Sequence, residues 1–458
     1  MRIELAHPMR AGEISNAIGS ACPIDYDTVI AAITTDSRLT RPGDLFIAIT
    51  GKTYDGHLFL DDAKRRGAAL LVSEQGGKDA LSVESTRNAL GTIAAYSLRK
   101  NRIPVIAITG SVGKTGTKEA VGAVLSTQLR VHKTSENQNN QLGVAYTVLS
   151  RKRNDELMIL EFGTNSKGEI ASHAAIAPPD VAIITRIGSA HIGAFGSREA
   201  ILNEKSDIYK GMTEGLLLLN GDDPYLRGLS PKIPVCYVGT GENSTIIASK
   251  VFFSRYGVSY TLLEKNGERR IFLRGAGRPQ IYASLFALGC ATHFNVRGDL
   301  AADALFRMPR PEGRQSIHSV GGILLIDDAY NASPESTEAA LELLNTLPTV
   351  GQRYAVLGDM LELGEMSEEL HRKIGNRAAN VADRLYFFGQ YAAAMADGAA
   401  EGGMPSECIA TFPDAEACLS ALRPRLTDGD TVLVKASHAL GGQKIVRGIC
   451  ALDGRLQD

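Results

Sequence analysis

Charge of one sign and long apolar runs are both missing from this chain of 458 residues. The 49 lysine and arginine residues nearly balance 51 aspartate and glutamate residues, which leaves a net charge of −2. This balance gives no electrostatic reason to expect a nucleic-acid or membrane-surface partner. Apolar runs such as the four leucines at 216–219 are far too short to cross a bilayer. We therefore expect no membrane insertion.

Cysteine is scarce and scattered. The six cysteines lie at 22, 236, 290, 408, 418 and 450, and they form neither a Cys-x-x-Cys pair nor a metal-like spacing. This usage is typical of reduced, mostly buried thiols in a cytosolic protein. The first residues also lack the apolar segment of a signal peptide. Both features favour a cytoplasmic location, and neither repeats nor low-complexity segments stand out.

What the sequence does contain is an alternation of apolar runs with helical patterns. Runs that end in polar or glycine residues occur at 103–109, 156–163, 180–188, 215–223, 322–331, 353–360, 384–390 and 430–438. Such runs predict strands buried on both faces, as in parallel sheets covered by helices. The pattern is that of a doubly wound α/β protein.

The length of the chain predicts about two to four domains. We place boundaries near Asn101 and near Pro311, which gives α/β domains at 1–100, 101–310 and 311–458. Runs at 43–51 and 67–74 predict strands of the small first domain. Two strand-like runs at 258–273 surround Asn266 and Gly267, a pair that favours a hairpin turn.

A glycine-rich loop, TGSVGKT at 109–115, lies between the apolar run at 103–109 and a helical pattern. Gly110, Gly113, Lys114 and Thr115 occupy places that a phosphate-binding loop requires, although Ile108 stands where the longer form of the motif has its first glycine. In such a loop backbone N–H groups surround the phosphate, lysine adds charge and the hydroxyl binds Mg²⁺. Phosphate binding, with ATP as the candidate, is favoured over a plain glycine-rich turn.

Polar residues at the ends of the apolar runs are candidate partners of this loop. Glu161 ends one run, and a metal ligand and a loop cap are equally good interpretations of it. His191 follows another run and by itself is better explained as a structural histidine. Lys205 by itself predicts an exposed helix charge. Asp327 and Asp328 suit ribose or cation contacts, with turn capping as the alternative.

Seven segments in order resemble the Mur ligase family, most closely the branch that acts on D-alanyl-D-alanine. They lie at 34–59, 109–115, 137–143, 161–170, 190–197, 325–336 and 356–375. The resemblance covers all three predicted domains, and the phosphate loop matches the family's own short form. It implies a small N-terminal α/β domain for the UDP substrate, a central P-loop ATPase domain with a parallel sheet, and a Rossmann-like C-terminal domain.

The resemblance implies ATP-driven amide-bond formation through an acyl phosphate. The substrates would be a UDP-N-acetylmuramoyl tripeptide and D-alanyl-D-alanine, joined during peptidoglycan precursor synthesis, with ATP and two Mg²⁺ ions as cofactors. A monomer is the family-like state. Lys114, His191 and Lys205 would be catalytic, and Lys205 falls where the family has a carbamylated lysine. Thr115, Glu161, His191 and Lys205 would hold metal.

The remaining roles also follow from the resemblance alone. Nucleotide contacts would come from Gly110, Ser111, Gly113, Lys114, Thr115, Gln280, Arg314, Asp328, Tyr330 and Asn331. Substrate contacts would come from Ser37, Arg38, Asn139, Asn140, Lys435 and Ser437.

Several positions depart from the family pattern. Pro279, Gln280 and Ala283 replace residues associated with adenine binding, and Gly193 stands where an acidic residue is common. His438 and Ala145 replace a common arginine and a usual proline. The alternatives are therefore a Mur-type ligase redirected to another acid and amine, a non-catalytic nucleotide-binding homologue, and an unrelated P-loop motor or kinase.

Overall fold

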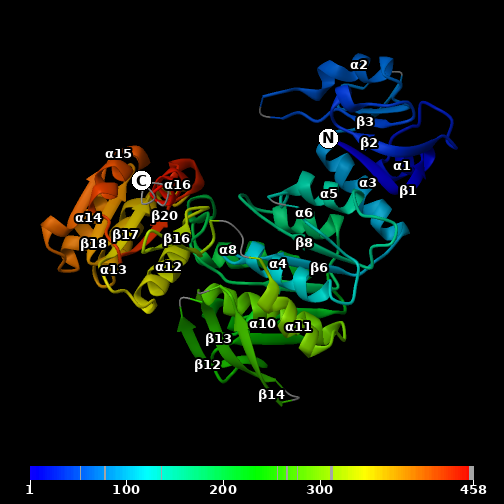
Figure 1. Cartoon of the computed structure of the whole chain (residues 1–458). Helices are drawn as coiled ribbons and strands as arrows, with labels where there is room; N and C mark the ends of the chain where they lie inside the picture. The colour runs from blue at the N-terminus through cyan, green and yellow to red at the C-terminus, as the bar shows by residue number, and fades with distance from the viewer. Residues whose placement is uncertain are drawn as a thin grey trace.

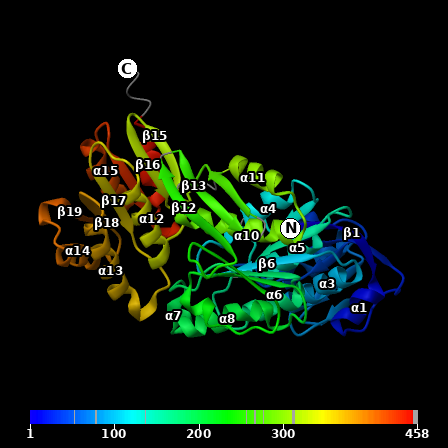
Figure 2. The ribbon, with the colours of Figure 1, turned by 90° about the horizontal axis from the view of Figure 1, so that it is seen from below.

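The chain forms three sheets with their own helices, which lie in a row along the molecule (Figure 1). This computed structural model describes residues 1–51, 53–76, 79–135, 137–254, 256–264, 267–275, 277–309 and 313–452. The central domain lies between the N-terminal and C-terminal domains in both views (Figures 1 and 2). Within the described residues, no helix has both the length and the apolar character needed to cross a membrane.

The N-terminal sheet has the order β1-β2-β3-β4-β5, with β1 antiparallel to β2 and the others parallel. Its strands are β1 (Arg2–Arg10), β2 (Val29–Thr34), β3 (Leu45–Ile47), β4 (Leu70–Ser73) and β5 (Ala80–Ser82). Its helices are α1 (Ala11–Ile18), η1 (Ser37–Leu39), η2 (Gly56–Phe59), α2 (Leu60–Arg65) and α3 (Thr86–Lys100). The strands predicted at 43–51 and 67–74 are confirmed as β3 and β4.

The central sheet has the order β14-β13-β12-β11-β10-β9-β6-β8-β7. Its strands are β6 (Val105–Thr109), β7 (Val131–Lys133), β8 (Leu157–Glu161), β9 (Val181–Ile184), β10 (Leu216–Asn220), β11 (Val235–Gly239), β12 (Ile246–Ser254), β13 (Gly257–Glu264) and β14 (Gly267–Leu273). Its helices are α4 (Lys114–Leu125), α5 (Gln141–Leu149), α6 (Glu169–Ile176), α7 (Ile192–Phe195), α8 (Arg198–Lys210), α9 (Pro224–Arg227), α10 (Arg278–His293) and α11 (Gly298–Arg307). β13 is antiparallel to both β12 and β14, and the strands from β7 to β12 are parallel.

The C-terminal sheet has the order β15-β16-β20-β17-β18-β19 and is parallel except for β15. Its strands are β15 (Ser316–Val320), β16 (Ile323–Asp328), β17 (Arg353–Gly358), β18 (Arg384–Phe388), β19 (Ile409–Phe412) and β20 (Thr431–Lys435). Its helices are α12 (Pro334–Thr346), η3 (Gly364–Met366), α13 (Ser367–Ala379), α14 (Ala392–Glu401), η4 (Ser406–Cys408), α15 (Ala415–Leu422), η5 (Arg423–Arg425), η6 (His438–Leu440) and α16 (Gly442–Cys450).

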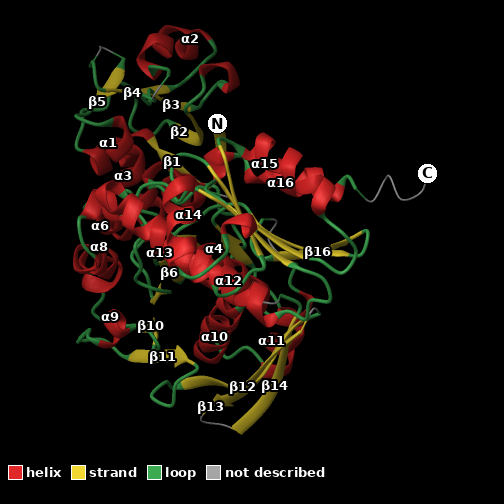
Figure 3. Cartoon of the chain, turned by 90° about the vertical axis from the view of Figure 1, so that its left-hand side faces the viewer, coloured by secondary structure: helices red, strands yellow, loops and turns green. Residues whose placement is uncertain are grey.

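Helices cover both faces of the C-terminal sheet, with α12 on one side and α15 and α16 on the other (Figure 3). Side chains that alternate along a strand therefore join different apolar clusters. Ile326 and Leu433 belong to the cluster that includes α12, whereas Leu325 and Val432 belong to the one that includes α16. This burial on both faces explains why the strands have unbroken apolar sequences.

The parallel order brings the carboxyl ends of β6, β8 and β9 to one edge of the central sheet. The glycine loop, Glu161 and the segment that leads to His191 follow these three strands. The predicted α/β fold class is thus confirmed. The boundary near Asn101 stays a prediction next to the end of α3, while the one at Pro311 and the turn residue Asn266 lie outside the described residues.

Candidate functional site

The glycine loop joins β6 to α4 in a conformation that requires its glycines. Gly110 has a φ of 148°, and a Cβ atom there would lie 1.9 Å from the hydroxyl oxygen of Thr185. Gly113 caps α4 with a φ of 86°. The hydroxyl of Thr185 donates to the carbonyl oxygen of Val112 at 2.6 Å. The segment after β9 thus holds the loop in place at the N-terminus of α4, where backbone N–H groups favour an anion.

Lys114 begins α4, and its side chain turns back over the loop. Its Nζ donates to the carbonyl oxygen of Gly110 at 2.6 Å. Burial lowers the pKa of Lys114, the nearby Glu161 carboxylate opposes that shift, and Arg314 of the C-terminal domain adds to it. Lys114 and Arg314 thus bring positive charge from two domains to one place, as a polyphosphate would require.

Glu161 ends β8 and is only 2% exposed. Its Oε1 accepts a hydrogen bond from Nδ2 of Asn139 at 3.0 Å, whereas Oε2 is buried and has no partner among the described residues. A buried carboxylate oxygen without a donor is costly, so the position suits a cation. This geometry fits a metal ligand better than a loop cap.

His191 precedes α7 with a φ of 63° and contacts the C-terminal domain. Its Nδ1 pairs with Oε2 of Glu362, which lies just before η3. Burial lowers the pKa of His191, and Glu362 opposes the shift. The backbone N–H of Gly193 donates to the carbonyl oxygen of Glu362 at 3.2 Å.

Close packing at Gly193 explains one departure from the family pattern, the absence of an acidic residue at this position. A Cβ atom there would lie 2.7 Å from the backbone nitrogen of Gly364, closer than packed atoms approach. An acidic side chain would therefore separate α7 from η3. The carboxylate beside His191 comes instead from Glu362.

Lys205 lies on α8 and is 2% exposed, so the interpretation as an exposed helix charge is wrong. A single helical position carries no signal of what packs against it, and here α8 contacts α6, β9 and β6 of the central domain. Burial lowers the pKa of Lys205 well below its ordinary value, and the charge of Lys114 lowers it further. The adjacent Glu204 accepts the backbone N–H groups of Gly168 at 2.7 Å and Ile170 at 2.9 Å. The environment thus favours a neutral amine on Lys205.

The C-terminal domain supplies a second group of polar residues. Nζ of Lys435 donates to Oδ2 of Asp328 at 2.7 Å and to the carbonyl oxygen of Asn331 at 3.0 Å. Burial raises the pKa of Asp328, and Lys435 opposes that shift. The guanidinium of Arg314 lies 4.1 Å from the centre of the Tyr330 ring. The Tyr330 hydroxyl donates to Oδ1 of Asn137 in the central domain.

A cavity of about 620 Å³ between the central and C-terminal domains brings most predicted residues together. Those that line it are Ser111, Gly113, Lys114, Thr115, Asn139, Asn140, Glu161, His191, Gln280, Arg314, Asp328, Tyr330, Asn331, Lys435 and Ser437. The cavity lining does not include Gly110 or Lys205, although the charge of Lys114 lowers the pKa of Lys205 and that of Lys205 lowers the pKa of His191.

Some of these side chains are already engaged in the protein. Oδ1 of Asn140 caps α5 by accepting the N–H of Gly143 at 2.9 Å. The hydroxyl of Ser437 accepts the N–H of Leu361 at 3.0 Å.

Ser37 and Arg38 lie apart from this cavity, in η1 of the N-terminal domain. The guanidinium of Arg38 donates to both carboxylate oxygens of Asp36, at 2.9 and 2.8 Å. These bonds lower the pKa of Asp36 to about 2.

Three residues that cross between domains were not identified from the sequence. Asn137 meets Tyr330, Glu362 meets His191, and Glu335 meets Ser189. Glu335 and Glu362 lie inside segments that carry the family resemblance. The resemblance is the one sequence signal for these two residues, because no local pattern distinguishes a carboxylate that contacts another domain from the acidic residues near it.

Family models match three stretches of the chain. They are described as "Mur ligase family, catalytic domain" at 29–115, "Mur ligase middle domain" at 108–291 and "Mur ligase, glutamate ligase domain" at 313–438.

Relatives match along nearly the whole chain. The UDP-N-acetylmuramoyl-tripeptide–D-alanyl-D-alanine ligase of Bacillus subtilis is 34% identical over 94% of this chain and 95% of its own length. The ligase of the same name from Escherichia coli is 32% identical over 92% and 94%.

Solved structures agree. A crystal structure of MurF from Acinetobacter baumannii has a TM-score of 0.89 and 28% identity, and covers 98% of this chain and 100% of that one. MurF ligase from Thermotoga maritima in complex with ADP has a TM-score of 0.84 and 30% identity, and covers 93% and 98%. On these similarities in sequence and in structure, the chain belongs to the Mur ligase family.

Proposed function

We propose that this Mur ligase uses ATP to join a UDP-N-acetylmuramoyl tripeptide to D-alanyl-D-alanine, a step of peptidoglycan precursor synthesis. The observation that carries the proposal is the half-paired, buried carboxylate of Glu161 in the cavity that Lys114 and His191 also line. The names of the relatives supply the substrate pair. The six scattered cysteines, which include no Cys-x-x-Cys pair, support a cytoplasmic location, where we expect a monomer.

The chemistry must overcome the poor leaving group of a carboxylate. The terminal phosphoryl group of ATP moves to a carboxylate oxygen of the tripeptide, so that the bond to ADP breaks and an acyl phosphate forms. The amine of D-alanyl-D-alanine then attacks the carbonyl carbon, the C–N bond forms, the amine loses a proton and phosphate leaves. Lys114 and the loop N–H groups neutralise the charge of the phosphoryl group and hold it in line.

Mg²⁺ fits the residues at this site. Among the described residues, no three His, Cys, Asp or Glu side chains could hold a metal ion as a group. Thr115 and Glu161 would therefore hold it together with phosphate oxygens, and His191 would support a second ion. When bound, Mg²⁺ neutralises negative charge on the transferred group. The unpaired Oε2 of Glu161 is the support for this assignment.

Lys205 carries a carbamate in this proposal. Only a neutral amine reacts with CO₂, and burial beside Lys114 lowers the pKa of Lys205. The resulting carboxylate would place negative charge toward the metal with more reach than glutamate has. Such a group would also offset the neighbouring charge of Lys114.

The substrates divide among the domains. Gln280, Arg314, Asp328, Tyr330 and Asn331 contact the nucleotide, which their places along the cavity support. Ser37 and Arg38 bind the UDP part in the N-terminal domain. The residues that bind the reacting substrates are Asn139, Asn140, Lys435 and Ser437. Closure of the domains excludes water from the acyl phosphate.

The test is phosphate release from ATP across a grid of UDP-N-acetylmuramoyl peptides and dipeptides. We expect release only when the tripeptide and D-alanyl-D-alanine are both present. Lys114→Ala should lower the rate by at least about a hundredfold, since it removes a charge from the transferring group. Lys205→Arg, which keeps a long basic side chain but cannot carry a carbamate, should be similarly impaired, and the mass of the native chain should include one CO₂.

Each other result selects an alternative. Release with a different acid and amine would identify a redirected ligase. No release with any pair, while ATP still binds, would identify a nucleotide-binding homologue without catalysis.

A further inference from the structure

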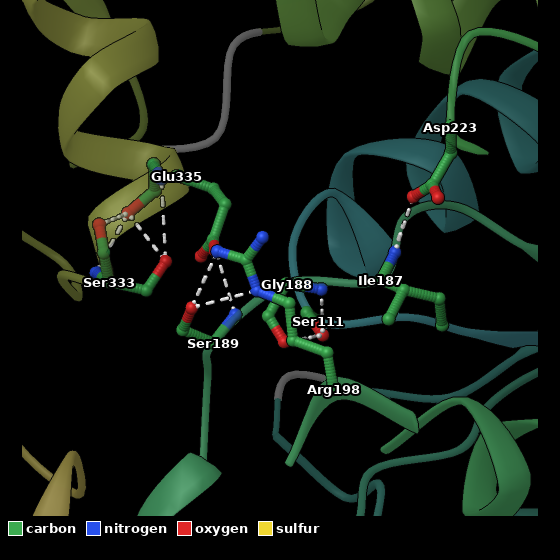
Figure 4. Close-up of polar contacts among 9 residues, drawn as sticks. Ser111, Ile187, Gly188, Ser189, Arg198, Asp223, Ser333 and Glu335 are labelled. Carbon is green, nitrogen blue, oxygen red and sulfur yellow. Dashed lines mark hydrogen bonds and ion pairs between the residues drawn. The ribbon is translucent and has the colours of Figure 1, made fainter. Parts of the chain in front are cut away.

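The first turn of α12 reaches from the C-terminal domain into the central domain (Figure 4). Ser333 caps this helix by accepting the N–H of Ser336 at 3.4 Å, and Pro334 takes the first helical position. Both features fix the start of the helix. Glu335 follows directly and extends away from its own helix toward Ser189 and Arg198.

Glu335 is buried, at 5% exposure, against two parts of the central domain. Its Oε1 accepts the backbone N–H of Ser189 at 2.7 Å, the hydroxyl of Ser189 at 2.9 Å and Nη2 of Arg198 at 3.1 Å. Nη2 of Arg198 also donates to the hydroxyl oxygen of Ser189 at 2.9 Å. A carboxylate oxygen with three donors, one of them charged, fixes its position closely.

The contact continues to the phosphate loop. Gly188 precedes Ser189, and its N–H donates to the hydroxyl oxygen of Ser111 in the loop at 2.9 Å. A Cβ atom on Gly188 would lie 2.6 Å from the carboxylate carbon of Glu335, so only glycine lets the carboxylate come this close. A movement of Glu335 therefore reaches Ser111 through two residues, Ser189 and Gly188, and two hydrogen bonds (Figure 4).

The Glu335 carboxylate is buried, although Arg198 is 40% exposed, and this distinguishes the contact from the ion pair between Glu342 of α12 and Arg278. Glu342 pairs with Arg278 at 2.7 Å, but their side chains are 39% and 41% exposed, and such pairs contribute little. Oε2 of Glu335, by contrast, is buried without a partner among the described residues. The hydrogen bonds of Glu335 offset only part of its desolvation cost. The contact therefore selects one docked position of the C-terminal domain but adds little net free energy to it.

We propose that Glu335 is a positioning residue that docks the C-terminal domain on Ser189 and so sets the phosphate loop for ATP. The inference rests on the proposed function for its ATP site, yet it concerns the arrangement of the domains. It assigns to Glu335 a part in nucleotide binding that requires no contact with the nucleotide. Two kinds of measurement therefore test it.

The variants are Glu335→Gln, Ser189→Ala and their double mutant, with Glu338→Gln as the control. Glu338 is exposed on the same helix and has no ion pair among the described residues. The first measurement is the affinity for Mg-ADP, with the radius of gyration from small-angle X-ray scattering with and without it. The second is the dependence of phosphate release on ATP concentration.

We expect Glu335→Gln to weaken ADP binding and raise KM for ATP by about tenfold, since hydrogen bonds to a charged carboxylate become weaker bonds to a neutral amide. Its radius of gyration should be larger than that of the wild type in the presence of ADP. Ser189→Ala should act in the same direction, and the double mutant should be no worse than Glu335→Gln, because both changes weaken the same contact. Glu338→Gln should match the wild type.

Wild-type affinity and radius in Glu335→Gln, or additive effects in the double mutant, would overturn the proposal. If Glu335→Gln does not fold, Ser189→Ala decides alone, and an unchanged KM and radius would refute it. Failure of the proposed function would look different: no acid and amine would stimulate phosphate release, while the effects on ADP binding and radius would remain.

Discussion

At the scale of single residues, burial decides the chemistry of several ionisable groups. Lys205 and His173 are both almost fully buried in the central domain. Burial lowers the pKa of Lys205 well below its ordinary value and lowers the pKa of His173 to about 4. Both ring nitrogens of His173 are buried without partners among the described residues, and its ring meets that of Phe162 edge to face at 5.4 Å. His173 is therefore a structural histidine, and its burial should lower the stability of the folded chain in acid.

The stability of the protein should depend on pH through His173. Its pKa in the folded chain, about 4, lies below its ordinary value of 6.5, so the unfolded chain binds the proton more readily. The stabilisation is complete above pH 6.5 and is lost as the pH falls toward 4. In His173→Leu, the loss of unfolding free energy between pH 7 and pH 4.5 should be smaller by about 2 to 3 kcal/mol.

Denaturant unfolding followed by circular dichroism at the two pH values measures this difference. His293→Gln is the control, because His293 is exposed on the same domain and should leave the loss unchanged. An equal loss in wild type and His173→Leu would show that His173 does not titrate on unfolding in this range.

At the scale of elements, close backbone contacts between domains depend on glycine. α7 and η3 come from different domains, and they meet where Gly193 lies against Gly364. The contact places the His191 and Glu362 side chains together. The Gly193 position therefore affects the site through packing rather than by a side chain of its own.

Gly193→Ala should disturb this contact. Its added methyl group would lie 2.7 Å from the nitrogen of Gly364, and moving the elements apart costs about 1 to 3 kcal/mol. We expect a lower midpoint of thermal unfolding and a ligase rate reduced by about tenfold. Gly211→Ala is the matched control, since nothing lies within 4 Å of its added carbon. Equal behaviour of the two variants would mean that the domains need not touch here.

At the scale of the whole molecule, apolar packing extends through all three domains. One apolar cluster includes Leu90 of α3, Val144 of α5 and Ile326 of β16. α3 packs on α5 and joins the N-terminal to the central domain through helices. The central and C-terminal domains also meet through polar contacts around the 620 Å³ cavity, as Tyr330 with Asn137 and Glu335 with Ser189 illustrate. A ligand in that cavity should therefore stabilise the second junction.

Mg-ADP should raise the thermal stability of the central and C-terminal domains. At about a hundredfold excess over Kd, binding stabilises the folded state by about 2.7 kcal/mol. This corresponds to an increase of about 5 to 10 °C in Tm for units of this size. Differential scanning calorimetry measures it, and Lys114→Ala should abolish most of the shift. A shift of the same size in Lys114→Ala would place the nucleotide elsewhere.

The sequence by itself determined the parts of this protein that depend on neighbours in the chain. The phosphate loop is readable because Gly110, Gly113, Lys114 and Thr115 act within one strand, loop and helix. The buried strands are readable because burial on both faces requires unbroken apolar residues, as in β8, β9 and β20.

Tertiary structure alone decided the contacts between distant segments. Glu335 and Ser189 are 146 residues apart, and Tyr330 and Asn137 are 193 apart. Whether such residues meet depends on strand order and on how whole domains dock, and no local pattern encodes either. Lys205 shows the same limit, because the cover that makes it a buried amine rather than a surface charge comes from other elements.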